Sequence, residues 1–248
     1  MTRDPILLRK EGGVARITLS RPPNNVIDDV RAASLRDACQ DVIEDDVVTV
    51  VVLTGSGAAF CVDEQPVDST SMENRRVADA IAAIPKPTVA ALNGDALGHG
   101  LEIALACDLR VAVDTARLGL GHVSRGELPW DGGTQRLPRL APRSIALEML
   151  LTGRVLSAHE ALACGLVTQA WPASEFESRT NDLARKLAAS APIAARYAKE
   201  AIHRGMDVPL EHGLRLETDL AVLLHTTADR AEGIGSFLKK GTPKFRGQ

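Results

Sequence analysis

Three short runs of apolar, mostly β-branched residues constrain the fold of this chain most strongly. They lie at residues 47–53 (VVTVVVL), 88–92 (TVAAL) and 109–113 (LRVAV). Strands that are apolar on both faces are typical of a largely parallel sheet covered by helices. Segments with helical spacing of apolar residues separate these runs, at 30–43 and 101–107. The sequence therefore predicts an α/β fold.

The N-terminal part adds a further strand and a helix start to this pattern. Residues 14–19 alternate as a strand does, and the proline-containing stretch 21–25 ends it because proline fixes φ and lacks an N–H. Asp28 or Asp29 is placed to cap the helix that follows.

The second half of the chain is dominated by helical patterns. From Ser144 onward only residues 166–171 read as extended, and the expected helices lie at 144–152, 157–163, 174–190, 192–204 and 208–240. A helical part beside a sheet-containing core is typical of a lid or an assembly surface. We therefore divide the chain into a core of residues 1–190 and a helical region of residues 191–248, within one continuous domain.

Composition narrows the possible functions. The chain has 248 residues with 45% hydrophobic and 25% charged residues, which suits one large domain with a substantial core. Its formal net charge of −3 and its aromatic content of 3% give no sign of a nucleic-acid partner. No stretch approaches the roughly 18 apolar residues of a membrane helix, and the N-terminus lacks the apolar segment of a signal peptide. We expect no nucleic-acid and no membrane partner.

The four cysteines are far apart and form no CxxC pair. A zinc site or a disulfide framework is therefore not expected, and a reducing cytoplasm is the simpler location. No metal site is predicted elsewhere in the chain.

Two familiar motifs are approached but not formed. Gly55 and Gly57 follow a strong strand, yet Phe60 stands where a dinucleotide-binding loop needs a third small residue. The glycines around Ser124 are one residue too far apart for the nucleophile elbow of a serine hydrolase. Neither a nucleotide-dependent oxidoreductase nor a serine hydrolase is predicted.

The segment from Asn93 to Glu102, NGDALGHGLE, joins a buried strand to a helix. Its glycines allow close backbone approach, and the free N–H groups at a helix start favour a partial negative charge. Glu102 lies about one turn into that helix, where its carboxylate can reach the same ligand. An oxyanion donor beside a carboxylate suits thioester enolate chemistry, although a tight strand–helix junction with a solvent-facing glutamate fits the spacing equally well.

Motifs along the whole chain are similar to those of the enoyl-CoA hydratase/isomerase (crotonase) family. The segment just described resembles that family's Asn-Gly, Gly-Gly-Gly, Glu and Cys-Asp signature. Other matching pieces occur in the family's order, among them LSRP at 19–22, PKP at 85–87, GGTQRL at 132–137, LTGR at 151–154 and PKFRG at 243–247.

The resemblance implies a crotonase (ClpP-like) spiral of repeated ββα units with a helical C-terminal trimerisation region. It further implies an acyl-CoA thioester as substrate and a homotrimer or hexamer as the assembly. No separate cofactor is expected, since coenzyme A is part of the substrate.

The resemblance also assigns site residues. The two oxyanion-hole amides map to His99, where the family has glycine, and to Glu64, in a loop that has lost its usual glycine. Glu102 maps to the first catalytic glutamate of the hydratases. The position of the second catalytic glutamate maps to His122, so this chain lacks the second carboxylate of the usual pair. Asp131 falls where some divergent members carry a functional aspartate, although it also suits a helix cap before Gly132.

For coenzyme A, the resemblance implies contacts from Arg21 and from the basic C-terminal residues Lys240 and Lys244, with the lysines reaching a neighbouring subunit or serving solubility alone. The predicted function is that of an enoyl-CoA hydratase or double-bond isomerase. The alternatives are a non-catalytic acyl-CoA-binding protein of the same fold and a divergent acyl-CoA lyase or hydrolase.

Overall fold

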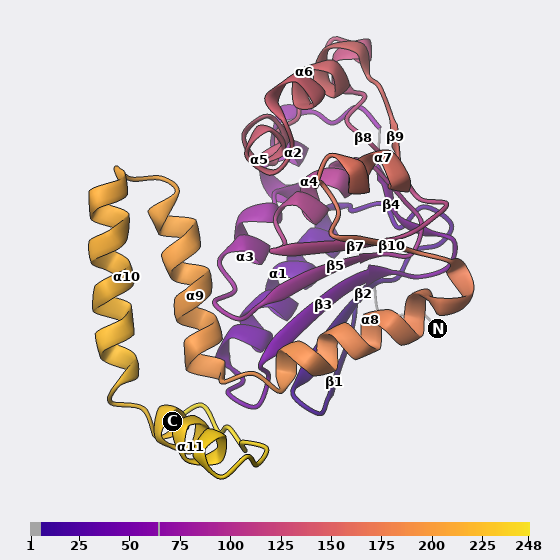
Figure 1. Ribbon diagram of the computed structural model, residues 1–248. Helices are drawn as coiled ribbons and strands as arrows, with labels where there is room; N and C mark the ends of the chain where they lie inside the picture. Colours follow the sequence, from indigo (N-terminus) through magenta and orange to yellow (C-terminus); the bar gives the residue numbers. More distant parts are fainter. Residues whose placement is uncertain (1–5, 64) are drawn as a thin grey trace.

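The computed structural model describes residues 6–63 and 65–248, and its body contains two β-sheets (Figure 1). The larger sheet has the strand order β1-β2-β3-β5-β7-β10. Its first pair is antiparallel and the remaining pairs are parallel. The strands are β1 (Ile6–Glu11), β2 (Val14–Leu19), β3 (Val50–Gly55), β5 (Thr88–Leu92), β7 (Leu109–Val113) and β10 (Gln169–Trp171).

The smaller sheet has the order β4-β6-β8-β9, with parallel pairs except for the last. Its strands are β4 (Ala59–Asp63), β6 (Asp95–Gly98), β8 (Arg117–Gly119) and β9 (Leu156–Ser157). These short strands were not predicted, because their apolar runs are too brief to stand out from the loops around them.

The chain passes repeatedly from the larger sheet to the smaller sheet and then into helix. Strands β3, β5 and β7 are followed by β4, β6 and β8 in turn. The helical segments that complete the turns are α2 (Ser69–Arg75) with α3 (Ala78–Ala82), α4 (His99–Leu105), and η1 (His122–Arg125) with α5 (Gly133–Leu140). This is the expected spiral of ββα units.

Local sequence explains the elements that were predicted well. Strands β3, β5 and β7 carry the apolar runs and are almost wholly buried, as expected for a parallel sheet covered on both faces. Helix α1 (Asp29–Glu44) begins after Asp28, whose side chain accepts a hydrogen bond from the N–H of Arg31.

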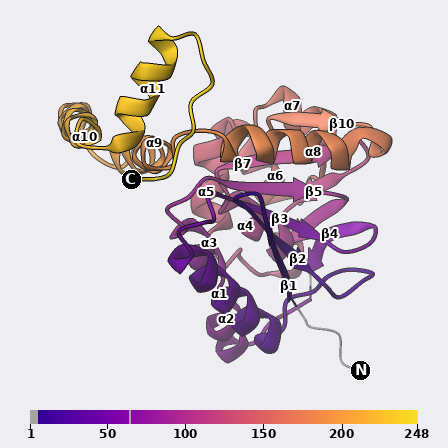
Figure 2. The same ribbon diagram turned by 90° about the horizontal axis from the view of Figure 1, so that it is seen from below.

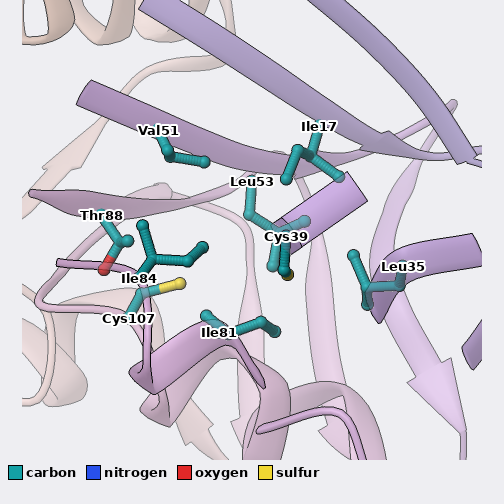
Figure 3. A pocket seen from close by; sticks show the side chains of 9 residues that line it. All are labelled: Ile17, Leu35, Cys39, Val51, Leu53, Ile81, Ile84, Thr88 and Cys107. Carbon is teal, nitrogen blue, oxygen red and sulfur yellow. The ribbon is translucent and has the colours of Figure 1, made fainter. Parts of the chain in front are cut away.

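The core between the larger sheet, α1 and α3 is packed with only a small void. A cavity of about 10 Å³ lies there, lined by the residues in Figure 3. It has room for no more than one water molecule. Its two cysteines, Cys39 and Cys107, are buried, and burial raises the pKa of each thiol to about 12. They act as small apolar side chains.

The C-terminal helices divide into two groups. Helices α6 (Arg143–Thr152), α7 (Ala158–Ala163) and α8 (Ala173–Ala188) belong to the body, and α8 packs along the larger sheet against β3 and β7. Helices α9 (Pro192–Gly205), α10 (Leu210–Leu224) and α11 (Ala228–Leu238) lie to one side of the body in both views (Figures 1 and 2).

The prediction of one helix over 208–240 was wrong, since two helices occupy that range. The chain breaks after Leu224, and the Thr227 side chain caps α11 by accepting from the N–H of Arg230. A continuous helical pattern hides such a break because threonine is also tolerated inside helices.

Helices α9 to α11 expose many large apolar side chains, including Met206, Leu210, Phe237 and Leu238, each at least 76% exposed. Within the described part of the chain, none of the helices combines the length and the hydropathy that crossing a membrane requires.

Candidate active site

Helix α4 packs against β4 and β6 of the smaller sheet and against α3 and α5, and it is buried at every residue. It starts after Gly98, whose φ of +60° favours glycine. A Cβ on Gly100 would lie 1.9 Å from the carbonyl oxygen of Cys61. These glycines bring the start of α4 against β4, so the helix begins two residues earlier than the predicted 101–107.

Glu102 is fully buried in this helix, with 0% of the residue exposed. Its Oε1 accepts hydrogen bonds from the backbone N–H groups of Asp131 and Gly133, each at 2.8 Å. Its Oε2 has no hydrogen-bond partner among the described residues. The carboxylate is thus held by one oxygen and free at the other, and the alternative of a solvent-facing glutamate is wrong.

The surroundings of Glu102 raise its pKa above the ordinary value. Burial is the main cause, and the charge of His99 and the two N–H donors act in the opposite direction. A raised carboxylate pKa favours a group that both accepts and returns a proton near neutral pH.

His122 faces the free oxygen of Glu102. Its Nε2 lies 3.8 Å from Oε2 of Glu102, which is too long for a direct hydrogen bond. Burial, helped by the nearby Arg125, lowers the pKa of His122 to about 4. The imidazole is therefore neutral at neutral pH, and a water molecule between the two side chains would have an acceptor on one side and a ring nitrogen on the other.

His99, the first residue of α4, lies between two buried carboxylates. Its Nε2 is 3.0 Å from Oδ2 of Asp131, and its Nδ1 is 3.9 Å from Oδ2 of Asp63. The ring of Trp130 packs against it, with ring centroids 4.3 Å apart. Burial alone would lower the pKa of His99, but the two aspartates raise it to about 9.

Asp131 turns its carboxylate away from Glu102. Its Oδ2 accepts from the backbone N–H groups of Val77 and Ala78, each at 2.9 Å, as well as contacting His99. The expected cap before Gly132 is wrong, because α5 has no side-chain cap and the carboxylate is at the start of α3 instead. Only the backbone of Asp131 touches Glu102, so a catalytic role for its side chain stays a prediction.

The residues predicted to bind coenzyme A do not come together within one chain. Arg21 lies two residues beyond β2, beside the end of β3, and pairs with Asp28 at 3.0 Å. The C-terminal tail lies at the other end of β3, where Phe245 and Arg246 share a cleft with Thr49. A strand of this length separates the two ends by roughly 17 Å.

Of the other predicted positions, Lys240 follows α11 and the N–H of Lys244 donates to Glu232. The oxyanion-hole candidate Glu64 lies outside the described residues. His99, Glu102, His122 and Asp131, all four of them predicted site residues, lie together in one cluster, and their roles stay predictions.

Sequence reasoning missed two members of this cluster. Asp63 contacts His99, and the N–H of Gly133 binds Glu102. Asp63 was visible only as a charged residue in an altered loop. The glycine at position 133 could have indicated a close contact, since a Cβ there would lie 3.1 Å from Oε1 of Glu102.

A buried carboxylate with one free oxygen at the start of a helix, set in a spiral of ββα units, is an arrangement suited to acid–base chemistry beside a polarised carbonyl group. A model of the family described as enoyl-CoA hydratase/isomerase matches residues 9–248. The chain belongs to the enoyl-CoA hydratase/isomerase family.

Individual relatives agree with this assignment. The (E)-benzylidenesuccinyl-CoA hydratase of Thauera aromatica is 39% identical, over 98% of this chain and 99% of that protein. The 2,3-dehydroadipyl-CoA hydratase of Escherichia coli is 35% identical, over 98% and 99%. A crystal structure of an enoyl-CoA hydratase from Bacillus anthracis has a TM-score of 0.95 and 35% identity, covering 99% of this chain and 100% of that one.

Proposed function

We propose that this protein is an enoyl-CoA hydratase, which adds water across the 2,3-double bond of an acyl-CoA thioester with Glu102 as the proton-transferring group. One observation carries the proposal. Glu102 is held by two backbone N–H groups on one oxygen, while its other oxygen faces His122 across 3.8 Å. The names of the relatives as hydratases support the same reaction.

In this mechanism a water molecule beside the Glu102–His122 pair hydrogen-bonds to both side chains. Glu102 takes a proton from the water while the oxygen of the water bonds to C3 of the substrate. The π electrons of the double bond then move toward the thioester oxygen. The enolate then takes a proton at C2 from Glu102, which restores the carboxylate. Neutral His122 orients the water and carries no net charge through the cycle.

The enolate oxygen needs two hydrogen-bond donors. We propose the backbone N–H groups of His99 and Glu64 for this role. His99 is well placed, because the first N–H groups of a helix have no partner inside the helix. Asp131, whose carboxylate is bound to α3 and His99, is assigned to positioning rather than to contact with substrate.

The second candidate is a double-bond isomerase that uses the same glutamate. It is favoured by the absence of a second carboxylate facing Oε2 of Glu102 in the described structure. Glu102 would then move one proton between two carbons without adding water.

Spectroscopy separates these reactions. The hydratase proposal expects crotonyl-CoA to lose its enone absorbance between pH 6 and 9. Loss of absorbance without water uptake, or no change in absorbance at all, would contradict the hydratase proposal. Deuterium exchange from solvent into a 3-enoyl-CoA supports the isomerase, and binding of the ester without any exchange supports a non-catalytic protein.

The mutant Glu102→Gln tests the central residue. Its amide oxygen keeps the acceptor for the two N–H groups, so the fold should persist, but it cannot take a proton. We expect kcat to fall on the order of 100-fold or more, with the melting temperature close to the wild-type value. An unchanged kcat would show that another group is the base.

We further propose that the reaction needs no cofactor beyond the coenzyme A of the substrate and takes place in the cytoplasm. We also propose a homotrimer or hexamer, built through helices α9 to α11. In such an assembly Lys240 and Lys244 would approach Arg21 of a neighbouring chain. This arrangement would account for the distance between these residues within a single chain.

A further inference from the structure

The imidazole of His99 is the least expected part of the cluster, because an oxyanion-hole position needs only a backbone N–H. The residue is 1% exposed, and its two neighbouring carboxylates have side chains 0% and 4% exposed. A side chain that replaces glycine in such a place must be compensated by its neighbours, and here the compensation is a pair of charges.

Asp131 links this imidazole to Glu102 through two hydrogen bonds, one at its carboxylate and one at its backbone N–H. Nε2 of His99 donates to Oδ2 of Asp131 at 3.0 Å, and the N–H of Asp131 donates to Oε1 of Glu102 at 2.8 Å. The same Asp131 oxygen is fixed by the start of α3. Asp131 is thus held by α3 and His99 at its carboxylate, and its N–H, together with that of Gly133, binds one oxygen of Glu102 and leaves the other free.

We propose that His99 is a positioning residue whose protonated imidazole holds Asp131 and, through it, orients and ionises Glu102. This inference rests on the proposed function only for the role of Glu102. His99 would then have two roles. Its backbone N–H would bind the substrate oxygen, and its side chain would position the general base Glu102.

The charges around His99 favour its protonated form. Asp131 and Asp63 face its two nitrogens, and Glu102 lies on the same helix. The positive Arg76 lies 3.8 Å from the other oxygen of Asp131. His122 adds a further ring, which is neutral above a pKa of about 4.

The coupling to Glu102 has a definite sign. The positive charge of His99 lowers the pKa of Glu102, against the effect of burial. Removing that charge should therefore raise the pKa of Glu102 further, so that less of it is ionised at neutral pH.

The first experiment is an NMR titration of wild-type protein labelled at histidine, which needs no turnover. The His99 signal is assigned by its absence in His99→Gln. We expect it to stay protonated up to a pKa of about 9. Titration at or below the ordinary value of about 6.5 would overturn the proposal.

The second experiment compares the pH dependence of kcat/KM on crotonyl-CoA. In His99→Gln we expect the acidic limb to move upward by about one pH unit or more, with kcat lowered at pH 7 and KM changed little. His159→Gln, an exposed histidine on α7, is the control and should match wild type. Acidic limbs that coincide in His99→Gln and wild type would overturn the proposal.

A third variant covers the case in which His99→Gln does not fold. Asp131→Asn keeps the N–H that binds Glu102 but removes the charge that binds His99. We expect the pKa of His99 to fall in this variant, and an unchanged pKa would contradict the proposed link. If wild type does not hydrate crotonyl-CoA, the proposed function fails, while the NMR titrations still decide the state of His99.

Discussion

At the residue scale, the site uses two buried histidines in opposite protonation states. The pKa of His99 is raised to about 9 by two aspartates, and that of His122 is lowered to about 4, mainly by burial. The two histidines differ in their distance from the nearest carboxylate. His99 donates to Asp131 at 3.0 Å, whereas His122 is 3.8 Å from the nearest oxygen of Glu102. Their order along the chain gives no sign of this difference.

Replacing His122 tests whether it is the partner of Glu102. His122→Gln keeps a polar side chain but changes the position of the group that holds the water. We expect kcat for hydration to fall at least about tenfold, since general acid–base groups and their orienting partners contribute on the order of 100-fold or more. The exposed His159→Gln is the matched control, and equal rates in both variants would remove His122 from the mechanism.

Stability should depend on pH through His99. Because its folded pKa of about 9 lies above the unfolded value of about 6.5, its charge stabilises the fold fully below pH 6.5, and this contribution is lost as pH rises through 9. The difference in free energy of unfolding between wild type and His99→Gln should therefore shrink from pH 6 to pH 9.5. Urea unfolding at several pH values measures it, and a constant difference would show that His99 is not charged in the folded state.

At the element scale, the close contact between α4 and β4 positions the site. Glu102 can be buried with its Oε1 satisfied by two N–H groups only because α4 starts directly against β4 and next to the loop before α5. Glu102 is the fourth residue of α4, so the proposed general base lies at the end of the first turn, close to the helix start.

Gly100→Ala tests this contact. Its Cβ would lie 1.9 Å from a backbone oxygen of β4, so one of the two elements must move. We expect a loss of more than about 2 kcal/mol in the free energy of unfolding, together with loss of activity. Gly235→Ala in α11 is the control, because no atom lies within 4 Å of its Cβ. Alanine in a helix should leave that variant equally or slightly more stable. Similar unfolding curves for the two variants would argue against the tight contact.

At the scale of the whole molecule, the body and helices α9 to α11 differ in how they bury apolar residues. The body has one continuous core. Helices α9 and α10 pack on each other, but their outer faces carry exposed apolar side chains, as does α11. Exposed apolar patches of this kind mark interaction surfaces, in line with the proposed trimer or hexamer.

Sedimentation measures that assembly. Wild type should sediment as a multiple of 26.4 kDa, and Phe237→Glu, at an 82% exposed position in α11, should shift the distribution toward smaller species. Val30→Glu, at a 68% exposed apolar position on α1, serves as the control. A monomeric wild type, or equal effects of the two variants, would contradict assembly through α11.

The sequence determined the family, the parallel sheet and the position of Glu102 near the start of a helix. Residues 88–92 and 109–113 form β5 and β7 with the predicted bounds, because a buried strand depends mainly on its own apolar run. The sequence also indicated a helix start near Glu102, two residues too late, because turn chemistry is local. The prediction of a single helix over 208–240 failed where the cause of the break is a cap rather than a change of period.

Only the tertiary structure decided which side chains meet. His99, Asp131 and Asp63 come from α4, a loop and β4, and no local pattern links them. The raised pKa of His99 follows from its distances of 3.0 and 3.9 Å to the two carboxylates, which depend on how the sheets and helices pack. The glycine-rich segment by itself indicates where the proposed general base, Glu102, lies along the chain, and the folded chain determines which of its oxygens lacks a hydrogen-bond partner.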